Sequence, residues 1–317
     1  MTQDGSMARR PLLMAAGLGS GSAAQAQSPL RLTLATATPG GGFPAYGAAF
    51  VGAIAAADPS IVIEARNTAG SLENVTLLAD RTVDLALVAG ETATAALARG
   101  AGITLLAAMY AQPGLFGLRA DSPARSIADL RGKRIAWGAR GSGFVVLARQ
   151  VMGGLGLDIE RDFEGVLLDR AGDGPAMVMD GRVAALWGGG AGWPGFVTLA
   201  ASPQGLRFLA PDAAERARIL AADPALRPMA LPPGSYAGQT TPVDSVGTWS
   251  LVLARPGLDE EAGFRIATAL HAARADLAAR LPQASETTAA NTAAAVADPA
   301  LIHPGVRRFL RGAELLR

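Results

Sequence analysis

Residues 30–47 read LRLTLATATPGGGFPAYG, and this stretch decides the predicted fold. The run from Leu30 to Ala37 is typical of a strand. After the glycines, apolar residues recur from Tyr46 to Ala57 at the spacing of a helix buried on one face. Glycines at such a junction let the backbone approach a ligand, and the free N–H groups of the helix start favour an anion. The stretch predicts either a ligand-binding turn or a tight turn with no further role.

Length and composition limit the class of protein. A chain of 317 residues with 50% hydrophobic residues is long enough for two domains with large cores. The net charge of +1 gives no general attraction to nucleic acid. The absence of cysteine excludes disulfides, thiolate metal sites and a cysteine nucleophile. The two histidines, His271 and His303, are too far apart in sequence for a metal-ligand motif, so we expect no metal and no cofactor.

The first 26 residues have the pattern of an export signal. Arg9-Arg10 precedes an apolar run from Pro11 to Leu18, and Ala24-Gln25-Ala26 matches a cleavage site. We expect residues 1–26 to be removed after Ala26, by a general or a twin-arginine route, and the mature protein to be periplasmic. A disordered tail is the alternative. No run reaches the roughly 18 apolar residues of a membrane span.

The opening pattern is repeated about one domain later. The predicted strand Ile135–Gly138 is followed by Gly141-Ser142-Gly143 and by a helix with one apolar face. Strands and helices alternate around both turns, which predicts two α/β units that face each other across a cleft. Extended runs near Phe116 and Leu251 are the expected hinge crossings, and the helical tail packs back onto the first unit. The predicted boundaries are 27–118 and 246–317 for the first lobe and 119–245 for the second.

Short motifs follow one another along nearly the whole chain after residue 26. They are Gly40-Gly41-Gly42-Phe43, Thr68-Ala69-Gly70-Ser71-Leu72-Glu73-Asn74, Asp84-Leu85-Ala86-Leu87-Val88, Asp129-Leu130-Arg131-Gly132-Lys133-Arg134, Gly141-Ser142-Gly143, Ala191-Gly192-Trp193-Pro194, Ser235-Tyr236-Ala237-Gly238-Gln239 and His303-Pro304-Gly305-Val306. Each motif is loose, but their order resembles the TAXI family of extracytoplasmic solute receptors, which serve TRAP-type secondary transporters.

The resemblance implies a type II periplasmic-binding-protein fold: two α/β lobes with mostly parallel central sheets, a two-stranded hinge and a helical C-terminal tail. It implies a receptor that captures a small organic anion or an amino acid, such as a dicarboxylate or glutamate, and delivers it to an integral-membrane TRAP permease. The chain departs from the family where Phe43-Pro44 replaces two tyrosines and where Ala89-Gly90 replaces a polar position. These departures leave the cleft fewer hydroxyl groups and bear on the identity of the solute.

Other functions remain open from the sequence. The same fold serves receptors of ABC importers, sensory receptors and exported enzymes. An enzyme is the least favoured, because Gly141-Ser142-Gly143 lacks the spacing of a nucleophile elbow. No glycine run precedes Lys133 as in a P-loop, and the glycines at 40–42 do not match a dinucleotide fingerprint. We therefore expect no catalysis.

Most of the candidate binding residues lie at or near the two glycine turns. Arg140 is the expected anchor for a carboxylate, because its guanidinium can bind one bidentately; a solvated loop arginine is the alternative. Ser71 could donate to a carboxylate or cap its helix, and Glu73 and Glu91 could balance an amine of the ligand. The predicted ligand-binding residues are Gly41, Gly42, Phe43, Tyr46, Ser71, Arg140, Ser142, Gly143 and Trp193.

Overall fold

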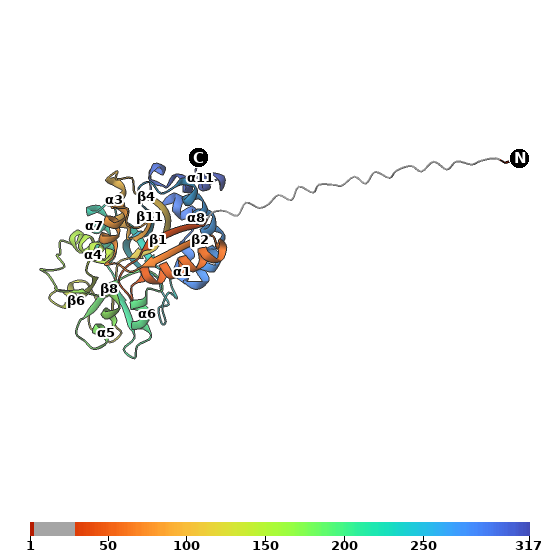
Figure 1. Cartoon of the computed structure of the whole chain (residues 1–317). Helices are drawn as coiled ribbons and strands as arrows, with labels where there is room; N and C mark the ends of the chain where they lie inside the picture. The colour runs from red at the N-terminus through yellow and green to blue at the C-terminus, as the bar shows by residue number, and fades with distance from the viewer. Residues whose placement is uncertain (3–28) are drawn as a thin grey trace.

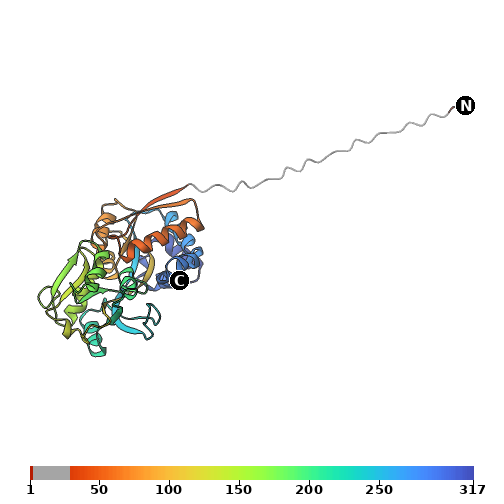
Figure 2. The same ribbon diagram turned by 90° about the horizontal axis from the view of Figure 1, so that it is seen from below.

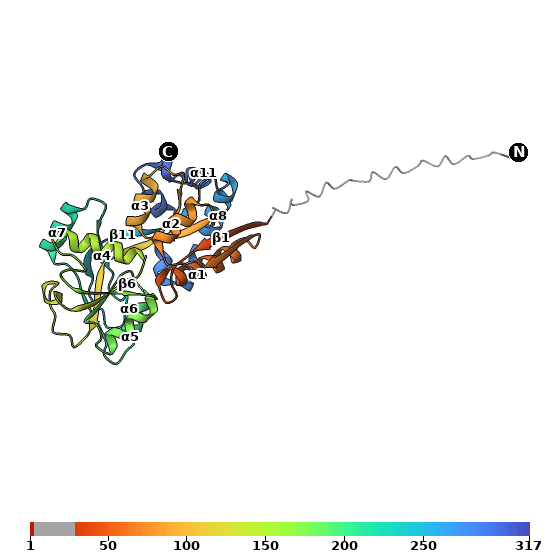
Figure 3. The same ribbon diagram turned by 60° about the vertical axis from the view of Figure 1, so that its left-hand side comes forward.

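A computed structural model describes residues 1–2 and 29–317 (Figure 1). Residues 3–26 of the predicted leader, with the cleavage position after Ala26, lie outside the described residues. Across the described ranges, no helix is both long and apolar enough to cross a membrane. The chain forms two α/β lobes that lie side by side, one around each of two sheets (Figure 3).

The first lobe is built on a six-stranded sheet that combines the beginning and the end of the chain. Its order is β10-β11-β3-β1-β2, with β4 paired to β11. β1 is parallel to β2 and β3, whereas β11 is antiparallel to β3, β4 and β10. β3 is buried along its whole length, as its apolar sequence predicts. The strands are β1 (Leu30–Ala35), β2 (Ile61–Arg66), β3 (Leu85–Val88), β4 (Thr104–Pro113), β10 (Arg227–Leu231) and β11 (Val243–Ala254).

The second lobe contains a five-stranded sheet of order β7-β6-β8-β5-β9. β6 is parallel to β7 and β8, and β5 is antiparallel to β8 and β9. Phe116 on β5 contacts the rings of Trp137 and Trp187, at centroid distances of 5.6 and 4.8 Å. The run near Phe116, expected as a hinge crossing, is therefore a core strand of this sheet. The strands are β5 (Leu115–Arg119), β6 (Arg134–Ala139), β7 (Glu164–Leu168), β8 (Ala185–Gly188) and β9 (Leu206–Leu209).

Helices follow most of the strands and cover the sheets. The helices α1 to α3 come before β4 in the chain and belong to the first lobe. The helices α4 to α7 come after β6 and belong to the second lobe. In the first lobe, α1 lies against the C-terminal helices (Figure 2). The helices before the C-terminal group are α1 (Gly42–Ala57), α2 (Ser71–Ala79), α3 (Gly90–Ala98), α4 (Gly143–Gly154), α5 (Gly174–Met179), α6 (Pro194–Ala200) and α7 (Ala213–Ala222).

The C-terminal helices pack onto the first sheet, as predicted. Ile302 lies beside Leu105 of β4, and the His303 N–H donates to the Leu105 carbonyl at 2.9 Å. The Nδ1 atom of His303 accepts the Gly305 N–H at 3.2 Å and caps the last helix. The helical tail is divided into several short helices. The elements are α8 (Glu260–Ala272), α9 (Arg274–Arg280), the 3₁₀ helix Pro282–Glu286, α10 (Ala289–Ala294) and α11 (Pro304–Gly312).

Two chain segments cross between the lobes side by side. Gly114 separates β4 from β5, and its N–H donates to the Val246 carbonyl of β11 at 2.9 Å. The Ser245 hydroxyl donates to the Gly114 carbonyl at 2.6 Å. β11 runs through both lobes: Val246 lies in the second core, and Leu253 lies in the first. The hinge is thus two-stranded and lies at Gly114 and Val246, and the exact lobe boundaries stay a prediction.

Candidate functional site

The first glycine turn positions the start of α1. Gly41 is the N-cap residue, and Gly42 and Phe43 begin the helix, both buried. A Cβ on Gly42 would come 3.0 Å from the Trp193 ring of the second lobe. Glycine permits this close approach of the two lobes, since a larger residue would require the Trp193 ring to shift. The local sequence therefore brings the N–H groups at the start of α1 against the opposite lobe.

The start of α2 lies beside it. Gly70 occupies the N-cap position with a φ of 123°, which favours glycine, so that Ser71 is the first helical residue and not the cap. The Ser71 hydroxyl instead accepts the Ala89 N–H at 3.0 Å and fixes the end of β3. Ser71 is 1% exposed. Its position supports the cleft wall from inside the first lobe.

The second glycine turn positions the start of α4 in the opposite lobe. Ser142 is the N-cap residue, and Gly143 begins the helix. A Cβ on Gly143 would lie 2.2 Å from the Ala89 Cβ, 2.7 Å from Glu91 Oε1 and 3.0 Å from Ser71 Oγ. The second turn thus meets the starts of α2 and α3 across the cleft.

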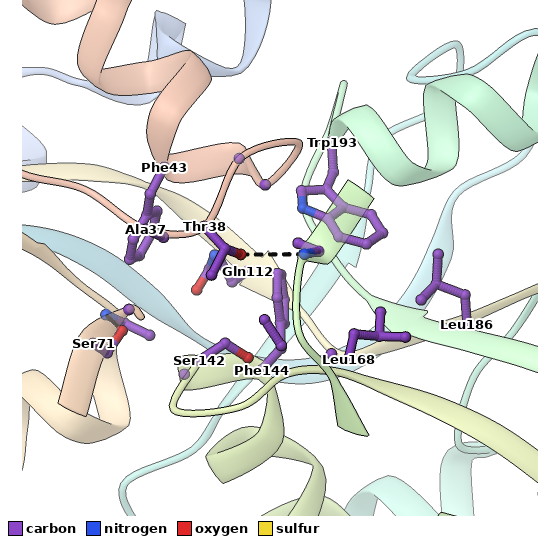
Figure 4. Close-up of a pocket in the computed structure, with 18 residues that line it drawn as sticks. Ala37, Thr38, Phe43, Ser71, Gln112, Ser142, Phe144, Leu168, Leu186 and Trp193 are labelled. Atoms are coloured by element: carbon purple, nitrogen blue, oxygen red, sulfur yellow. Dashed lines mark hydrogen bonds between the residues drawn. The ribbon is translucent and has the colours of Figure 1, made fainter. Parts of the chain in front are cut away.

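Backbone contacts hold the lobes together around these turns. The Ala171 N–H donates to the Thr38 hydroxyl at 3.2 Å, the contact drawn in Figure 4. The Leu72 N–H donates to the Gly141 carbonyl at 3.4 Å. Gly40 packs so closely on the second lobe that a Cβ there would lie 2.5 Å from the Gly172 Cα. The arrangement is a closed one.

A cavity of about 50 Å³ lies between the lobes (Figure 4). This is room for several water molecules or a small solute. The starts of α1, α2 and α4 all reach it, and N–H groups in a first helical turn have no carbonyl of their own helix to bond. The lining residues are Ala37, Thr38, Gly41, Gly42, Phe43, Gly70, Ser71, Ala89, Gln112, Gly138, Ala139, Ser142, Gly143, Phe144, Leu168, Ala171, Leu186 and Trp193.

The lining is neutral but contains unsatisfied hydrogen-bonding groups. Ser142 Oγ and Trp193 Nε1 are buried, and neither has a partner in the part of the chain that the structure describes. A buried polar atom of this kind is normally bonded, so both are available to a ligand. No charged side chain lines the cavity among the described residues. An anion there would be bound by helix starts, a hydroxyl and an indole N–H.

One buried carboxyl lies just behind the lining. Glu91 is 6% exposed, and its Oε2 accepts the Thr248 hydroxyl at 2.8 Å. Its Oε1 has no partner within the described ranges. Burial raises the pKa of Glu91 to about 7, against the lowering effect of its own N–H and of Thr248. The carboxyl therefore binds its proton far more tightly than an exposed glutamate does.

Two of the predicted residues lie away from the cavity. Tyr46 is fully buried in the first core, where its hydroxyl contacts the Thr287 hydroxyl at 3.1 Å. Arg140 points outward, with its side chain 69% exposed and its Nε 3.7 Å from Asp169. Neither is in the lining, and the structure does not place a guanidinium there. The other predicted residues line the cavity: Gly41, Gly42, Phe43, Ser71, Ser142, Gly143 and Trp193.

Several lining residues were missed. Gln112 is a buried polar residue near the end of an apolar strand, and this position in the sequence was a usable signal. Phe144 follows the second glycine turn in the same way that Phe43 follows the first. The sequence places it on the apolar face of a helix and does not distinguish it as a ligand contact. Leu168 and Leu186 carry no such signal, because apolar residues at strand ends equally belong to a core.

Tyr236→Phe is expected to lower the free energy of unfolding by about 2–4 kcal/mol and to weaken ligand binding. The Tyr236 hydroxyl accepts the Trp193 N–H at 2.7 Å and donates to the Gly190 carbonyl at 2.6 Å, both buried. The substitution leaves these two backbone groups unsatisfied and frees the loop that holds Trp193. Denaturant titration measures the loss of stability. A variant as stable as the parent would show that Tyr236 does not fix this loop.

Curated protein sequences gave no match. A structure from Bordetella bronchiseptica RB50 is similar with a TM-score of 0.54 and 14% identity, covering 90% of this chain and 98% of that one. The substrate binding protein of an amino acid ABC transporter is similar with a TM-score of 0.50 and 12% identity, covering 80% and 98%. These likenesses establish a type II periplasmic-binding-protein fold. The family model described as NMT1-like matches residues 34–313, so the chain belongs to the NMT1-like family.

Proposed function

We propose that the protein is an extracytoplasmic receptor that closes its two lobes on a small organic anion or amino acid. The observation that carries the proposal is the meeting of three helix starts with two unpartnered donors, Ser142 Oγ and Trp193 Nε1, around one cavity. Helix starts carry partial positive charge and free N–H groups, so they stabilise an anion without a cationic side chain.

The lining supports binding without catalysis. No titratable side chain lines the cavity among the described residues, and the buried carboxyl of Glu91 lies behind Ser71 and Gly143. General acid–base chemistry needs a titratable group within hydrogen-bond reach of the ligand. Capture and release by lobe closure require only the hinge at Gly114 and Val246.

The transport partner is the finer part of the proposal. The order of motifs resembles the TAXI family and supports delivery of the solute to a TRAP-type permease. Such a receptor is periplasmic, which agrees with the export signal whose cleavage is expected after Ala26. A receptor of an ABC importer is an equally supported alternative, because a structural neighbour is the substrate binding protein of an amino acid ABC transporter. The neighbouring genes distinguish them. A gene for a large fused permease favours the first, and a gene for a transport ATPase favours the second.

The proposal is tested by a thermal-shift screen of monocarboxylates, dicarboxylates, 2-oxoacids and amino acids. A ligand that binds only the folded state adds about 2.7 kcal/mol of stability when present at a hundred times its Kd, and so raises the melting temperature. Sugars and divalent metal ions serve as the contrasting ligands. If only these raise the melting temperature, the anion-binding proposal is wrong.

Trp193→Phe is expected to weaken binding of the screened acid by about tenfold, or 1.4 kcal/mol. The variant keeps an aromatic ring near Phe144, whose ring centroid lies 5.5 Å from that of Trp193, but lacks the indole N–H. Isothermal titration calorimetry measures the change. Arg140→Ala is the contrasting variant, because an exposed ion pair contributes little, and its affinity should stay within about twofold of the parent. The reverse order of effects would make Arg140 the anchor.

A further inference from the structure

Two hydroxyl groups in the lining of the cavity have their oxygens already engaged. Thr38 Oγ1 accepts the Ala171 N–H at 3.2 Å, and Ser71 Oγ accepts the Ala89 N–H at 3.0 Å. Neither hydroxyl donates to a group in the part of the chain that the structure describes. Because a hydroxyl carries one hydrogen, each of these two has a hydrogen left to donate to a ligand.

Two further side chains add donors. Trp193 Nε1–H can only donate, and Ser142 Oγ, which can donate or accept, is also without a partner among the described residues. The starts of α1, α2 and α4 add the N–H groups of three first helical turns. The free hydrogens therefore come from both lobes and from both side chains and backbone.

The backbone carbonyls of the lining, in contrast, are largely used inside the protein. Those of the helix starts accept N–H groups one turn further along, and those of the strand ends and turns accept N–H groups of neighbouring segments. The lining residues whose carbonyls already have such a bond are Thr38, Gly70, Ala89, Ala139, Ser142, Leu168 and Ala171. The cavity therefore presents many free donors and few free acceptors.

Gln112 adds an acceptor to the lining, but a neutral one. It lies near the end of β4, opposite Thr248 of β11, and it is 4% exposed. Its amide has no hydrogen-bond partner within the described ranges. Figure 4 shows Gln112 among the labelled lining residues, close to the hydroxyl of Thr38. An amide oxygen can accept a hydrogen, but it supplies no negative charge to balance a cation.

A positively charged group in the cavity would have no counter-charge. No carboxylate lines the cavity among the described residues. The Glu91 carboxyl lies behind Ser71 and Gly143, and its Oε2 accepts the Thr248 hydroxyl at 2.8 Å. Since burial raises the pKa of Glu91 to about 7, this carboxyl is mostly uncharged in mildly acidic solution. An ammonium group enclosed there would lose its water without gaining an ion pair.

We propose that the cavity selects acids whose polar groups are all acceptors, such as 2-oxoacids, over the 2-amino acids of the same carbon skeleton. A 2-oxoacid carries a carboxylate and a carbonyl and has no hydrogen to donate, whereas an amino acid carries an ammonium group with three. The inference rests on the proposed function, since it assumes that the cavity binds a small acid. It narrows that solute from organic anions and amino acids to one class.

The test uses isothermal titration calorimetry at about pH 6 on three matched pairs: pyruvate and alanine, 2-oxobutyrate and 2-aminobutyrate, and 2-oxoglutarate and glutamate. In each pair that binds, the 2-oxoacid should bind at least about tenfold more tightly. Gln112→Glu places a carboxylate in the lining and gives an ammonium group its counter-charge, so the preference should fall by about tenfold or more. Gln204→Glu, which adds the same charge outside the lining, is the matched control and should keep the preference within about twofold.

The outcomes separate the two proposals. If no acid of the thermal-shift screen binds, the proposed function fails, and the selectivity falls with it. If acids bind but no 2-oxoacid does, or an amino acid binds as tightly as its 2-oxo partner, the proposed function stands and the selectivity is wrong. An unchanged preference in Gln112→Glu would also contradict the selectivity. Should this variant not fold, the three pairs still decide in the parent protein, which needs no substitution.

Discussion

Gly143→Val is expected to lower ligand affinity by about a hundredfold or more, while both lobes keep their folds. A Cβ at this position would lie 2.2 Å from the Ala89 Cβ and 2.7 Å from Glu91 Oε1, both in the opposite lobe. Carbon atoms do not approach to 2.2 Å, and valine adds two methyl groups beyond that Cβ. Because the contact lies across the cleft, the variant can relieve it by staying open.

The measurement combines calorimetry with small-angle X-ray scattering. The parent should show a smaller radius of gyration when ligand is added, and Gly143→Val should show no such change. Gly153→Val is the matched control, because Gly153 lies near the end of the same helix and has open space around its Cβ direction. Affinity that stays within about threefold in Gly143→Val would mean that the closed contact is not needed for binding.

The two lobes should fold in this variant because their cores are separate. Leu34, Phe50 and Ile302 belong to the core of the first lobe, and Trp137 and Val151 belong to that of the second. The clash reaches only Ala89 of the first core, and opening of the cleft relieves it. The melting temperature of Gly143→Val is therefore expected to lie within a few degrees of that of the parent. A loss of 1 kcal/mol lowers the melting temperature by about 2–4 °C in proteins of somewhat smaller size.

The positions of the helix starts were predictable because they depend on local sequence. A strand, a glycine turn and an apolar helical face define where α1 and α4 begin, and no distant residue is needed to recognise them. The side chains that point into the cavity depend on the fold. Arg140 lies in the second turn, but its N–H donates to the Leu168 carbonyl at 2.9 Å and continues the β6–β7 pairing, which leaves the side chain outside.

Tyr46, on the first helix, also shows that local sequence does not determine which side chains reach the cavity. The sequence predicts it both on the buried helix face and in the binding site, and the structure places it on the buried face against Phe50, with ring centroids 5.9 Å apart. Asp84 belongs to a motif of the family resemblance, and its role is to join strands. Its carboxylate accepts the Thr33 N–H at 2.9 Å and the Arg255 Nε–H at 2.8 Å. A motif residue need not touch a ligand.

β10 was missed because its pairing is not local. The segment from Arg227 to Leu231 contains Pro228 and lies near a proline- and glycine-rich loop, so its sequence favours no strand. It forms one by pairing with β11, at the edge of the sheet, where proline is tolerated. Leu231 from this strand packs into the second lobe, in a cluster with Trp193 and Tyr236. Long-range pairing of this kind leaves little trace in a single sequence.

Glu91→Gln is expected to raise the free energy of unfolding at about pH 8 by roughly 3 kcal/mol and to leave it nearly unchanged at about pH 4. Burial raises the pKa of Glu91 from its ordinary 4.5 to about 7. As the pH rises through this interval, the unfolded chain loses its proton while the folded protein retains it, so the folded state loses stability. Below 4.5 both states are protonated, and above 7 both are ionised, so the penalty is then constant.

The difference between the free energies of unfolding of Glu91→Gln and of the parent, taken at each pH, isolates the contribution of Glu91. Glutamine keeps an oxygen that can accept the Thr248 hydroxyl, which the Glu91 carboxylate accepts at 2.8 Å, but it carries no charge at any pH. Denaturant titrations at several pH values should show this difference growing between about pH 4.5 and 7 and level above it. Glu64→Gln, at an exposed position on β2, is the matched control. A difference that stays flat across this range would mean that Glu91 is ionised in the folded protein, with its charge balanced by the facing start of α4.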